Sequence, residues 1–468
     1  MYSIYSIISG VLLGLAFPKF SLWWLAWIAL VPFFYALNNA KNLKESSACA
    51  FAFGLVFFGI NLFWITSLFR FAGWWVVIGW LALALFQSVF IILFSIFYFQ
   101  LSAFKLRITR YALPVTMSLL WLAIEWLRSL GPFGVSAGGV GYTQAPFLPL
   151  IQIASFAGVY GVSFLVVFFN AALAAVLPSP ANRDRKTAAM FLAVALFLVV
   201  ASSLYGIRIT RYLPAGRHGA LPVTLPKLAL IQPNIDQFDK LNPAKVPLIF
   251  SIHEDMSRQA AKEKPEIIIW PETAIFTYIL RDPVYFPKLK ELVKELAAWF
   301  IIGAPHYEGN RIFNSMVSLD PQTGPYSRYD KEHLVPFGEY LPFKAILLPL
   351  LKPTGYFEGD FEFGSYSGPL SAAGYKIAPA ICFESTFPGL MKKRARDADF
   401  ILTITNDGWF GDSAAPYQHL ENGIFRAIEN RKYFVQVGNT GISAVIDPYG
   451  RVLKRTKLNE RAVLIFGQ

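Results

Sequence analysis

Residues 73–104 read GWWVVIGWLALALFQSVFIILFSIFYFQLSAF, an apolar stretch without a single charged side chain. A helix needs about 20 such residues to cross the hydrocarbon core of a bilayer, so this stretch is long enough to span a membrane. Working outward from it, similar apolar stretches recur throughout the first half of the chain. They lie at 2–17, 21–38, 47–67, 111–127, 150–177 and 187–206. The pattern predicts about seven transmembrane helices within residues 1–206.

The two halves of the 468-residue chain differ sharply in charge content. Residues 1–206 contain eleven Lys or Arg and three acidic residues, whereas the second half has the composition of a water-soluble domain. Overall, only 15% of residues are charged, against about 25% in a typical globular chain. A single soluble domain is therefore excluded. The net charge of +12 indicates cytoplasmic loops and anionic lipid headgroups rather than nucleic acid, because the basic residues form no long stripe.

The loops between the apolar stretches predict the orientation of the chain, since Lys and Arg gather on the cytoplasmic side. Alternate loops hold Lys41, Lys44, Lys105, Arg107, Arg110, Arg183, Arg185 and Lys186 on one side, against Lys19, Arg70 and Arg128 on the other. We therefore expect a cytoplasmic N-terminus. After seven crossings, the second half emerges on the opposite side of the membrane.

From Pro226 onward, short β-rich stretches alternate with helical ones. Predicted strands are Leu228–Pro233, Ile267–Trp270, Phe300–Gly303, Ser315–Leu319, Lys376–Cys382, Phe400–Thr405, Phe434–Val437, Ser443–Ile446 and Val463–Phe466. Predicted helices are Pro247–Glu263, Pro283–Trp299 and Tyr417–Lys432. This alternation is typical of a layered α/β domain.

Three segments of this half concentrate chemically capable side chains. The apolar strand in IIIWPE leads to Glu272, a rigid and partly desolvated carboxylate suited to a general base. The segment YDKEHLVPFGE places Lys331 beside an apolar turn, and APAICFE ends a strand at Cys382. A strand-end cysteine at a turn is a common way to display a nucleophile.

Each of these residues alone has a simpler structural explanation. Cys382 could be a small buried hydrophobe, Glu272 could cap a helix, and Lys331 could be a surface charge. Together they supply the nucleophile, base and cation that cysteine acyl chemistry requires. The base or the cation favours the thiolate, and the cation can also stabilise the oxyanion of a tetrahedral intermediate.

These motifs resemble those of a known family. WPET with Glu272, YDKEHLVPFGEY with Lys331 and AICFE with Cys382 are similar to the Glu-Lys-Cys triad of the nitrilase superfamily. Three further motifs, NDGWFG (406–411), QHL (418–420) and NTGISAVIDPYG (439–450), narrow the resemblance to the apolipoprotein N-acyltransferase family. It covers nearly the whole chain.

The resemblance implies a multi-span α-helical membrane domain followed by an α/β domain, a nitrilase-like α-β-β-α sandwich. We expect a transmembrane domain of about seven helices at 1–206, a connector at 207–226 and a nitrilase-like (carbon-nitrogen hydrolase) catalytic domain at 227–468. It also implies the bacterial inner membrane as location, with the catalytic domain in the periplasm.

The implied activity is a two-step acyl transfer, the last step of lipoprotein maturation. Cys382 would take the acyl chain of a membrane phospholipid, typically phosphatidylethanolamine, as a thioester. The α-amine of the N-terminal diacylglyceryl-cysteine of an apolipoprotein would then accept it. Glu272 would act as general base, and Lys331 would stabilise the oxyanion. No cofactor or metal is implied.

The family's site also suggests supporting residues. Glu339 and Glu384 match acidic positions around the site, where they handle protons or support the triad, or else simply form an ion pair with Lys331. Phe383 would be a further supporting residue. The expected pocket wall consists of Trp270, Asn406, Asp407 and Trp409. Two histidines, His333 and His419, are expected to be hydrogen-bonded structural residues.

The chain departs from the family pattern in three places. Phe383 stands where a Tyr often follows the cysteine, and Leu241 stands where a Trp commonly follows the Lys of Gln237-Phe238-Asp239-Lys240. Family members usually return to the membrane in a final span, whereas this sequence stops at Gln468 after a β-like stretch.

Two other functions remain open from the sequence. A membrane-tethered amidase or nitrilase would use the same triad to hydrolyse a small amide, although one span would suffice to tether it. A transporter or scaffold would carry a non-catalytic external domain. Transporters tend to place ionisable groups near the middle of the membrane, and the predicted spans are almost free of such groups.

Overall fold

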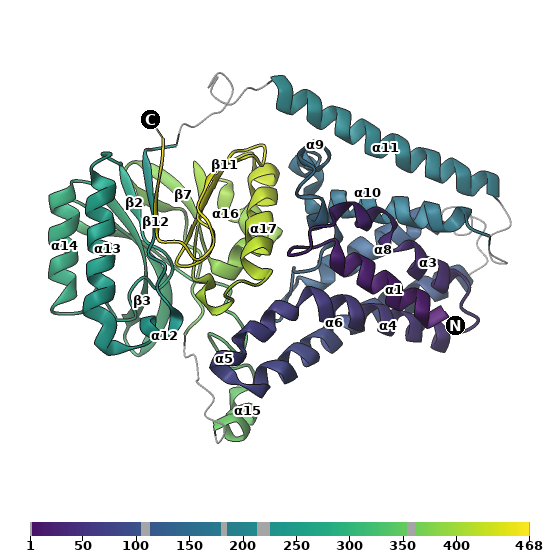
Figure 1. The fold of residues 1–468 in the computed structure, drawn as a ribbon, viewed down its shortest axis with the longest axis horizontal. Helices are drawn as coiled ribbons and strands as arrows, with labels where there is room; N and C mark the ends of the chain where they lie inside the picture. The colour runs from purple at the N-terminus through teal and green to yellow at the C-terminus, as the bar shows by residue number, and fades with distance from the viewer. Residues whose placement is uncertain (1, 104–112, 179–184, 213–224, 353–360, 468) are drawn as a thin grey trace. The chain divides into compact units, whose positions relative to one another are not determined.

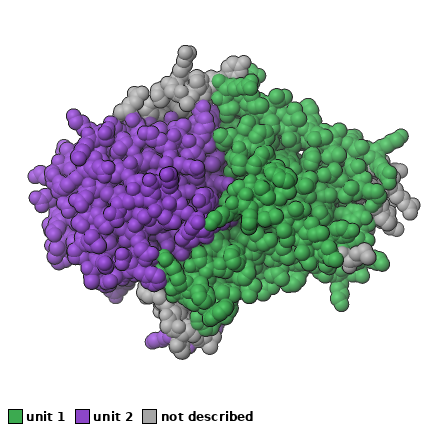
Figure 2. Space-filling model, in the orientation of Figure 1, with its two compact units in different colours: residues 1–215 green, residues 216–468 purple. Residues whose placement is uncertain are grey.

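The computed structural model describes residues 2–103, 113–178, 185–212, 225–352 and 361–467. It divides the chain into two compact units, residues 1–215 and 216–468, which Figure 2 shows in different colours. The basic residues Lys105, Arg107, Arg110 and Arg183, used above to predict orientation, lie outside the described residues.

The first unit is helical (Figure 1). Its helices are α1 (Tyr2–Leu15), α2 (Ala26–Ala29), α3 (Val31–Asn38), α4 (Leu43–Asn61), α5 (Phe69–Ala72), α6 (Trp74–Ala103), α8 (Leu113–Arg128), α9 (Leu148–Ile151), α10 (Ala154–Val176) and α11 (Arg185–Tyr212). Among the described residues, α4, α6, α10 and α11 are long and apolar enough to cross a membrane. The other three predicted spans are also helical but shorter, and the seven-span topology stays a prediction.

Small residues and buried amides join these helices. A Cβ at Gly10 of α1 would lie 2.9 Å from the Phe53 carbonyl oxygen of α4, so the close contact between these two helices requires glycine. The Asn170 side chain of α10 accepts a hydrogen bond from the Leu30 N–H, at the α2–α3 junction, and donates one to the Ala26 carbonyl of α2, both at 2.9 Å. Because apolar helices gain little by burial within lipid, such close packing and polar contacts stabilise their association.

The second unit contains two six-stranded sheets. One has the order β12-β1-β2-β3-β4-β5 and the other β11-β10-β9-β8-β7-β6. The strands of the first sheet are β1 (Leu228–Gln232), β2 (Ile267–Ile269), β3 (Trp299–Glu308), β4 (Arg311–Asp320), β5 (Gly324–Asp330) and β12 (Ala462–Phe466). Those of the second are β6 (Leu370–Ala372), β7 (Tyr375–Ile381), β8 (Phe400–Thr405), β9 (Phe434–Gly438), β10 (Ala444–Ile446) and β11 (Val452–Arg455).

Helices cover the outer face of each sheet (Figure 1). They are α13 (Val246–Ala261) and α14 (Tyr285–Leu296) on the first sheet, and α16 (Pro388–Ala395) and α17 (Ala415–Asn430) on the second. The short helices are α12 (Gln237–Lys240) and α15 (Lys344–Leu351). The expected α-β-β-α sandwich is confirmed.

Alternation along the strands explains these layers, because successive side chains of a strand point to opposite faces. In β2, Ile267 and Ile269 pack in the core between the two sheets, whereas Ile268 packs in the core beneath the helices. All three are fully buried. Strands buried on both faces therefore have the continuous apolar sequences seen here.

The structure differs from the predicted elements in a few places. Strands β5, β6 and β11 and helix α16 were not predicted. Trp299 begins β3 instead of ending a helix, and Cys382 lies just after β7 instead of within it. Helix α11 continues to Tyr212, past the predicted start of the connector at 207, and residues 213–224 of that connector lie outside the described residues.

Candidate active site

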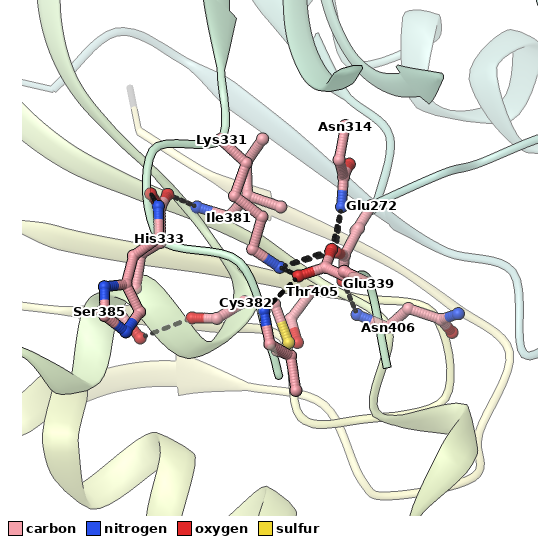
Figure 3. A network of polar contacts seen from close by, with 12 residues as sticks. Glu272, Asn314, Lys331, His333, Glu339, Ile381, Cys382, Ser385, Thr405 and Asn406 are labelled. Atoms are coloured by element: carbon pink, nitrogen blue, oxygen red, sulfur yellow. Dashed lines mark hydrogen bonds and ion pairs between the residues drawn. The ribbon is translucent and has the colours of Figure 1, made fainter. Parts of the chain in front are cut away.

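The site lies where strand ends of both sheets meet in the second unit, as Figure 3 shows. Glu272 and Lys331 follow β2 and β5 of the first sheet. Cys382 and Asn406 follow β7 and β8 of the second. Residues far apart in the sequence therefore lie around one point.

Glu272 sits on a tight corner after β2. A Cβ at Gly303 would lie 2.5 Å from the Pro271 carbonyl oxygen and 2.6 Å from the Glu272 Cα, so only glycine lets the corner pack against β3. Glu272 is 7% exposed. Its Oε1 accepts a hydrogen bond from Asn314 Nδ2 at 2.8 Å, and its Oε2 accepts one from the Asn406 N–H at 2.9 Å.

Lys331 is almost completely buried, and two carboxylates face its ammonium group. Its Nζ donates to Glu339 Oε1 at 2.9 Å and lies 3.5 Å from Glu272 Oε1. Burial by itself would lower the pKa of Lys331, but Glu339 and Glu272 outweigh it and raise the pKa above its ordinary value. The side chain therefore stays cationic at neutral pH.

Asn314 of β4 holds the two carboxylates in place. Its Nδ2 donates to Glu272 and to Glu339, each at 2.8 Å. Its main-chain carbonyl accepts from the Lys331 N–H at 2.8 Å. Asn314 was not predicted from the sequence, because it is one of several polar residues in β4 and nothing local distinguishes it.

Cys382 has an unusual backbone conformation for a residue with a side chain, with φ at +54°. It lies at the turn between β7 and the 3-10 helix Cys382–Thr386, and its side chain is partly exposed. Burial, and next the charge of Glu272, raise the pKa of the Cys382 thiol, while Lys331 opposes the shift. The group is thus a thiol at neutral pH, so a nucleophilic role would require a base beside it.

Glu384 is fully buried and joins the cysteine turn to the Lys331 loop. Its Oε2 accepts from the Ile381 N–H at 2.8 Å, directly before Cys382. Its Oε1 accepts from the N–H groups of Glu332 and His333 at 2.9 and 3.0 Å, directly after Lys331. Of the two supporting acids, Glu339 pairs with Lys331 in this structure, and Glu384 pairs with Arg394.

Phe383 packs edge-on against Phe387, with ring centroids 4.9 Å apart, beside the thiol-bearing turn. Asn406 is buried, and its Nδ2 donates to Gln237 Oε1 at 2.9 Å. Asp407 is also buried, and Trp409 is partly exposed. Asn406 adjoins Glu272 through its main-chain N–H, and the pocket-wall role of Asn406, Asp407 and Trp409 stays a prediction.

Trp270 differs from the pocket-wall expectation. Its side chain is fully buried in the core beneath the helices, where Nε1 donates to Ser257 Oγ of α13 at 2.9 Å. The reason is the alternation of β2, which turns this residue to the helical face. Trp270 therefore anchors the corner that carries Glu272.

Two family models match the chain. Residues 9–172 match the apolipoprotein N-acyltransferase N-terminal domain, and residues 227–466 match the carbon-nitrogen hydrolase family. Among solved structures, a carbon-nitrogen hydrolase from Helicobacter pylori is 14% identical, with a TM-score of 0.40 over 51% of this chain and 87% of that one. A Nesterenkonia amidase of the nitrilase superfamily is 19% identical, with a TM-score of 0.40 over 53% and 93%.

Full-length relatives are closer in sequence. The apolipoprotein N-acyltransferase of Geobacter metallireducens is 35% identical, over 98% of this chain and 88% of its own length. That of Rickettsia prowazekii is 30% identical, over 91% and 84%. Similarity of this extent spans both the helical and the sandwich unit, and the chain belongs to the apolipoprotein N-acyltransferase family.

Proposed function

We propose that this chain transfers an acyl chain from a membrane phospholipid to the α-amine of the N-terminal diacylglyceryl-cysteine of apolipoproteins. Its family membership and its long apolar helices support this function. The observation that carries the proposal is the partly exposed thiol of Cys382 beside a buried carboxylate–ammonium pair, Glu272 and Lys331.

In the first step, Glu272 takes the proton of the Cys382 thiol while Sγ attacks the carbonyl carbon of the phospholipid ester. The resulting oxyanion lies near the Lys331 ammonium, which stabilises it. The ester C–O bond then breaks, and Glu272 returns the proton to the departing oxygen. The products are a thioester on Cys382 and a lysophospholipid.

In the second step, the α-amine of the apolipoprotein attacks the thioester carbonyl. Glu272 takes one proton from the amine, Lys331 again stabilises the oxyanion, and the C–S bond breaks. The proton returns to the sulfur, which restores the thiol and leaves the acyl chain in an amide bond. We propose Glu339 as the group that keeps Lys331 in place, and Glu384 as the group that fixes both loops.

The proposed arrangement in the cell follows from the substrates, since both are anchored in a bilayer. Residues 1–206 would form the transmembrane domain, 207–226 the connector and 227–468 the catalytic domain on the periplasmic face of the inner membrane. Phosphatidylethanolamine is the proposed donor. Confining both reactants at the membrane contributes through proximity, and a site shielded from water protects the thioester from hydrolysis.

The test is intact-mass detection of the acyl-enzyme. Purified full-length protein in vesicles of phosphatidylethanolamine should gain the mass of one acyl chain on Cys382 and release one lysophospholipid. Cys382→Ser should abolish the thioester, whereas Cys49→Ser, at the buried thiol of α4, is the matched control and should keep it. Wild-type protein without any adduct, or full transfer by Cys382→Ser, would contradict the proposal.

The amidase alternative differs in its acceptor, which is water. A diacylglyceryl-cysteine peptide added to the labelled protein should remove the label from Cys382 as an N-acyl peptide. Release of free fatty acid at the same rate with and without the peptide would favour hydrolysis. The family membership does not favour that alternative.

A further inference from the structure

The Cys382 turn is held on both sides by polar groups, and the mechanism above does not use those on its C-terminal side. A φ of +54° at a residue with a side chain is strained and persists only where its surroundings hold it. On the N-terminal side, Glu384 holds the Ile381 N–H. On the C-terminal side, the Cys382 carbonyl oxygen accepts from Ser385 Oγ and from His419 Nε2, each at 3.1 Å.

His419 of α17 connects that carbonyl to a buried carboxylate. Its Nδ1 lies 3.4 Å from Asp407 Oδ1, which also accepts from Thr405 Oγ1 at 3.0 Å. Its Nε2 lies 2.8 Å from Ser385 Oγ. His419 and Asp407 are 6% and 2% exposed, so water cannot replace these contacts.

The hydrogen-bond pattern fixes the protons on the imidazole. A carbonyl oxygen only accepts, and the Ser385 hydroxyl already donates to it, so both partners of Nε2 require a proton on Nε2. The Asp407 carboxylate likewise requires a proton on Nδ1. Burial would lower the pKa of His419, but Asp407 beside Nδ1, and more weakly Glu272, raise it above its ordinary value.

We propose that Asp407 and His419 are a positioning pair for the nucleophile, in which the doubly protonated imidazole holds the Cys382 carbonyl and thereby keeps Sγ directed at Glu272 and Lys331. The inference rests on the proposed role of Cys382 and adds the groups that hold its backbone. Neither residue touches the substrate. A neutral imidazole carries a proton on only one nitrogen. It would therefore lose its hydrogen bond either to Asp407 or to the Cys382 carbonyl.

Two substitutions separate this role from general packing. The amide nitrogen of Gln can reach the position of Nε2, and that of Asn can reach only the position of Nδ1. His419→Gln therefore keeps the bond to Cys382 and should form the acyl adduct within about fivefold of the wild-type rate. His419→Asn keeps only the bond to Asp407 and should be slower by about tenfold to a hundredfold, with an unchanged half-saturating phospholipid concentration.

The measurement is the rate of acyl-adduct formation on the full-length protein in phosphatidylethanolamine vesicles, with thermal unfolding as a check on folding. His306→Gln is the matched control, because His306 lies on β3 and contacts Arg328 away from the triad. Equal rates for the Gln and Asn variants, whether both fast or both slow, would overturn the proposal.

If both His419 variants fail to fold, Ser385→Ala keeps the test open. It removes one donor to the Cys382 carbonyl and should slow adduct formation by about fivefold, and an unchanged rate would count against the positioning role. Failure of the proposed function looks different, because Cys382→Ser would then transfer acyl chains as well as wild type does.

Discussion

The Glu384 carboxylate receives two hydrogen bonds from the guanidinium of Arg394, at 2.9 and 3.1 Å, and both side chains are fully buried. Tyr329 donates a third bond to the same carboxylate at 2.6 Å. A buried ion pair contributes net stability only when its remaining hydrogen-bonding groups are also satisfied. Here, main-chain N–H groups from both loops of the site donate the remaining hydrogen bonds to the Glu384 carboxylate.

We expect Glu384→Gln to destabilise the protein and to change its response to acid. Burial opposes ionisation, but Arg394 and Tyr329 lower the pKa of Glu384 to about 2. The folded state therefore gains on the order of 3 kcal/mol above the unfolded-state pKa of about 4.3. This gain is lost as the pH falls through 4 towards 2, because the carboxylate must then take up a proton.

Thermal unfolding at pH 7 and at pH 3 measures this effect. The wild-type midpoint should exceed that of Glu384→Gln at pH 7, and the gap should narrow at pH 3. Glu308→Gln is the control, because Glu308 contacts Arg328 on the surface, where an ion pair contributes little to stability. A gap that stays constant with pH would show that the charge of Glu384 is not what stabilises the fold.

Glu272→Gln should slow acyl-adduct formation by about 10²–10⁴-fold at neutral pH, because the thiol loses its base. The Glu272 carboxylate raises the pKa of the Cys382 thiol, so removing it lowers that pKa, although burial still keeps it above its ordinary value. The variant should therefore recover part of its rate as the pH rises and hydroxide forms the thiolate. Wild-type protein should instead lose activity on acidification, because the proposed reaction needs a carboxylate that can accept the thiol proton. A flat profile in both proteins would exclude Glu272 as the base.

Asn314→Asp should be more harmful than Asn314→Ala. Aspartate would place a third carboxylate beside Glu272 and Glu339, with Lys331 as the ammonium that faces this group. Like charges this close repel one another, so the new carboxyl group favours a bound proton or disturbs the base and the ammonium beside it. We expect about a tenfold loss for the alanine variant and about a further tenfold loss for the aspartate variant in adduct formation at pH 7. Raising the pH should restore only the aspartate variant, and equal losses at every pH would rule out the charge effect.

Reporter fusions test the predicted orientation. A phosphatase that is active only in the periplasm should be active when fused after residue 468 and inactive when fused within residues 39–42. The second fusion site lies in the loop between α3 and α4 that holds Lys41. The positive-inside rule predicts this loop to be cytoplasmic. An inactive fusion after residue 468 together with an active fusion within residues 39–42 would show the opposite orientation.

Much of the fold follows from local patterns in the sequence. The central strands β1, β2, β8 and β9 could be predicted because burial on both faces leaves continuous apolar stretches. The edge strands β5 and β11 could not, because most of their side chains are exposed and polar residues interrupt the pattern.

The site divides in the same way. Glu272 and Cys382 stand beside recognisable strand ends, and Lys331 lies in a motif that resembles the family's, so all three could be proposed from the sequence. The partners of the site, Asn314 and Arg394, could not, because they come from distant segments and carry no local signal. Trp270 was expected at the pocket because it precedes Glu272, but the alternation of its strand turns it to the other face.

The origin of the reactive groups in two different sheets has a consequence for a chain that is still being made. Glu272 and Lys331 precede Cys382 in the sequence, so both are synthesised before the segment that bears Cys382 emerges from the ribosome. Until the second sheet docks on the first, the sulfur has neither its proton acceptor nor its cation. If Glu272 and Lys331 act as proposed, a nascent or half-folded copy lacks both partners of its thiol, and reactivity towards lipid begins only when the whole sandwich is complete.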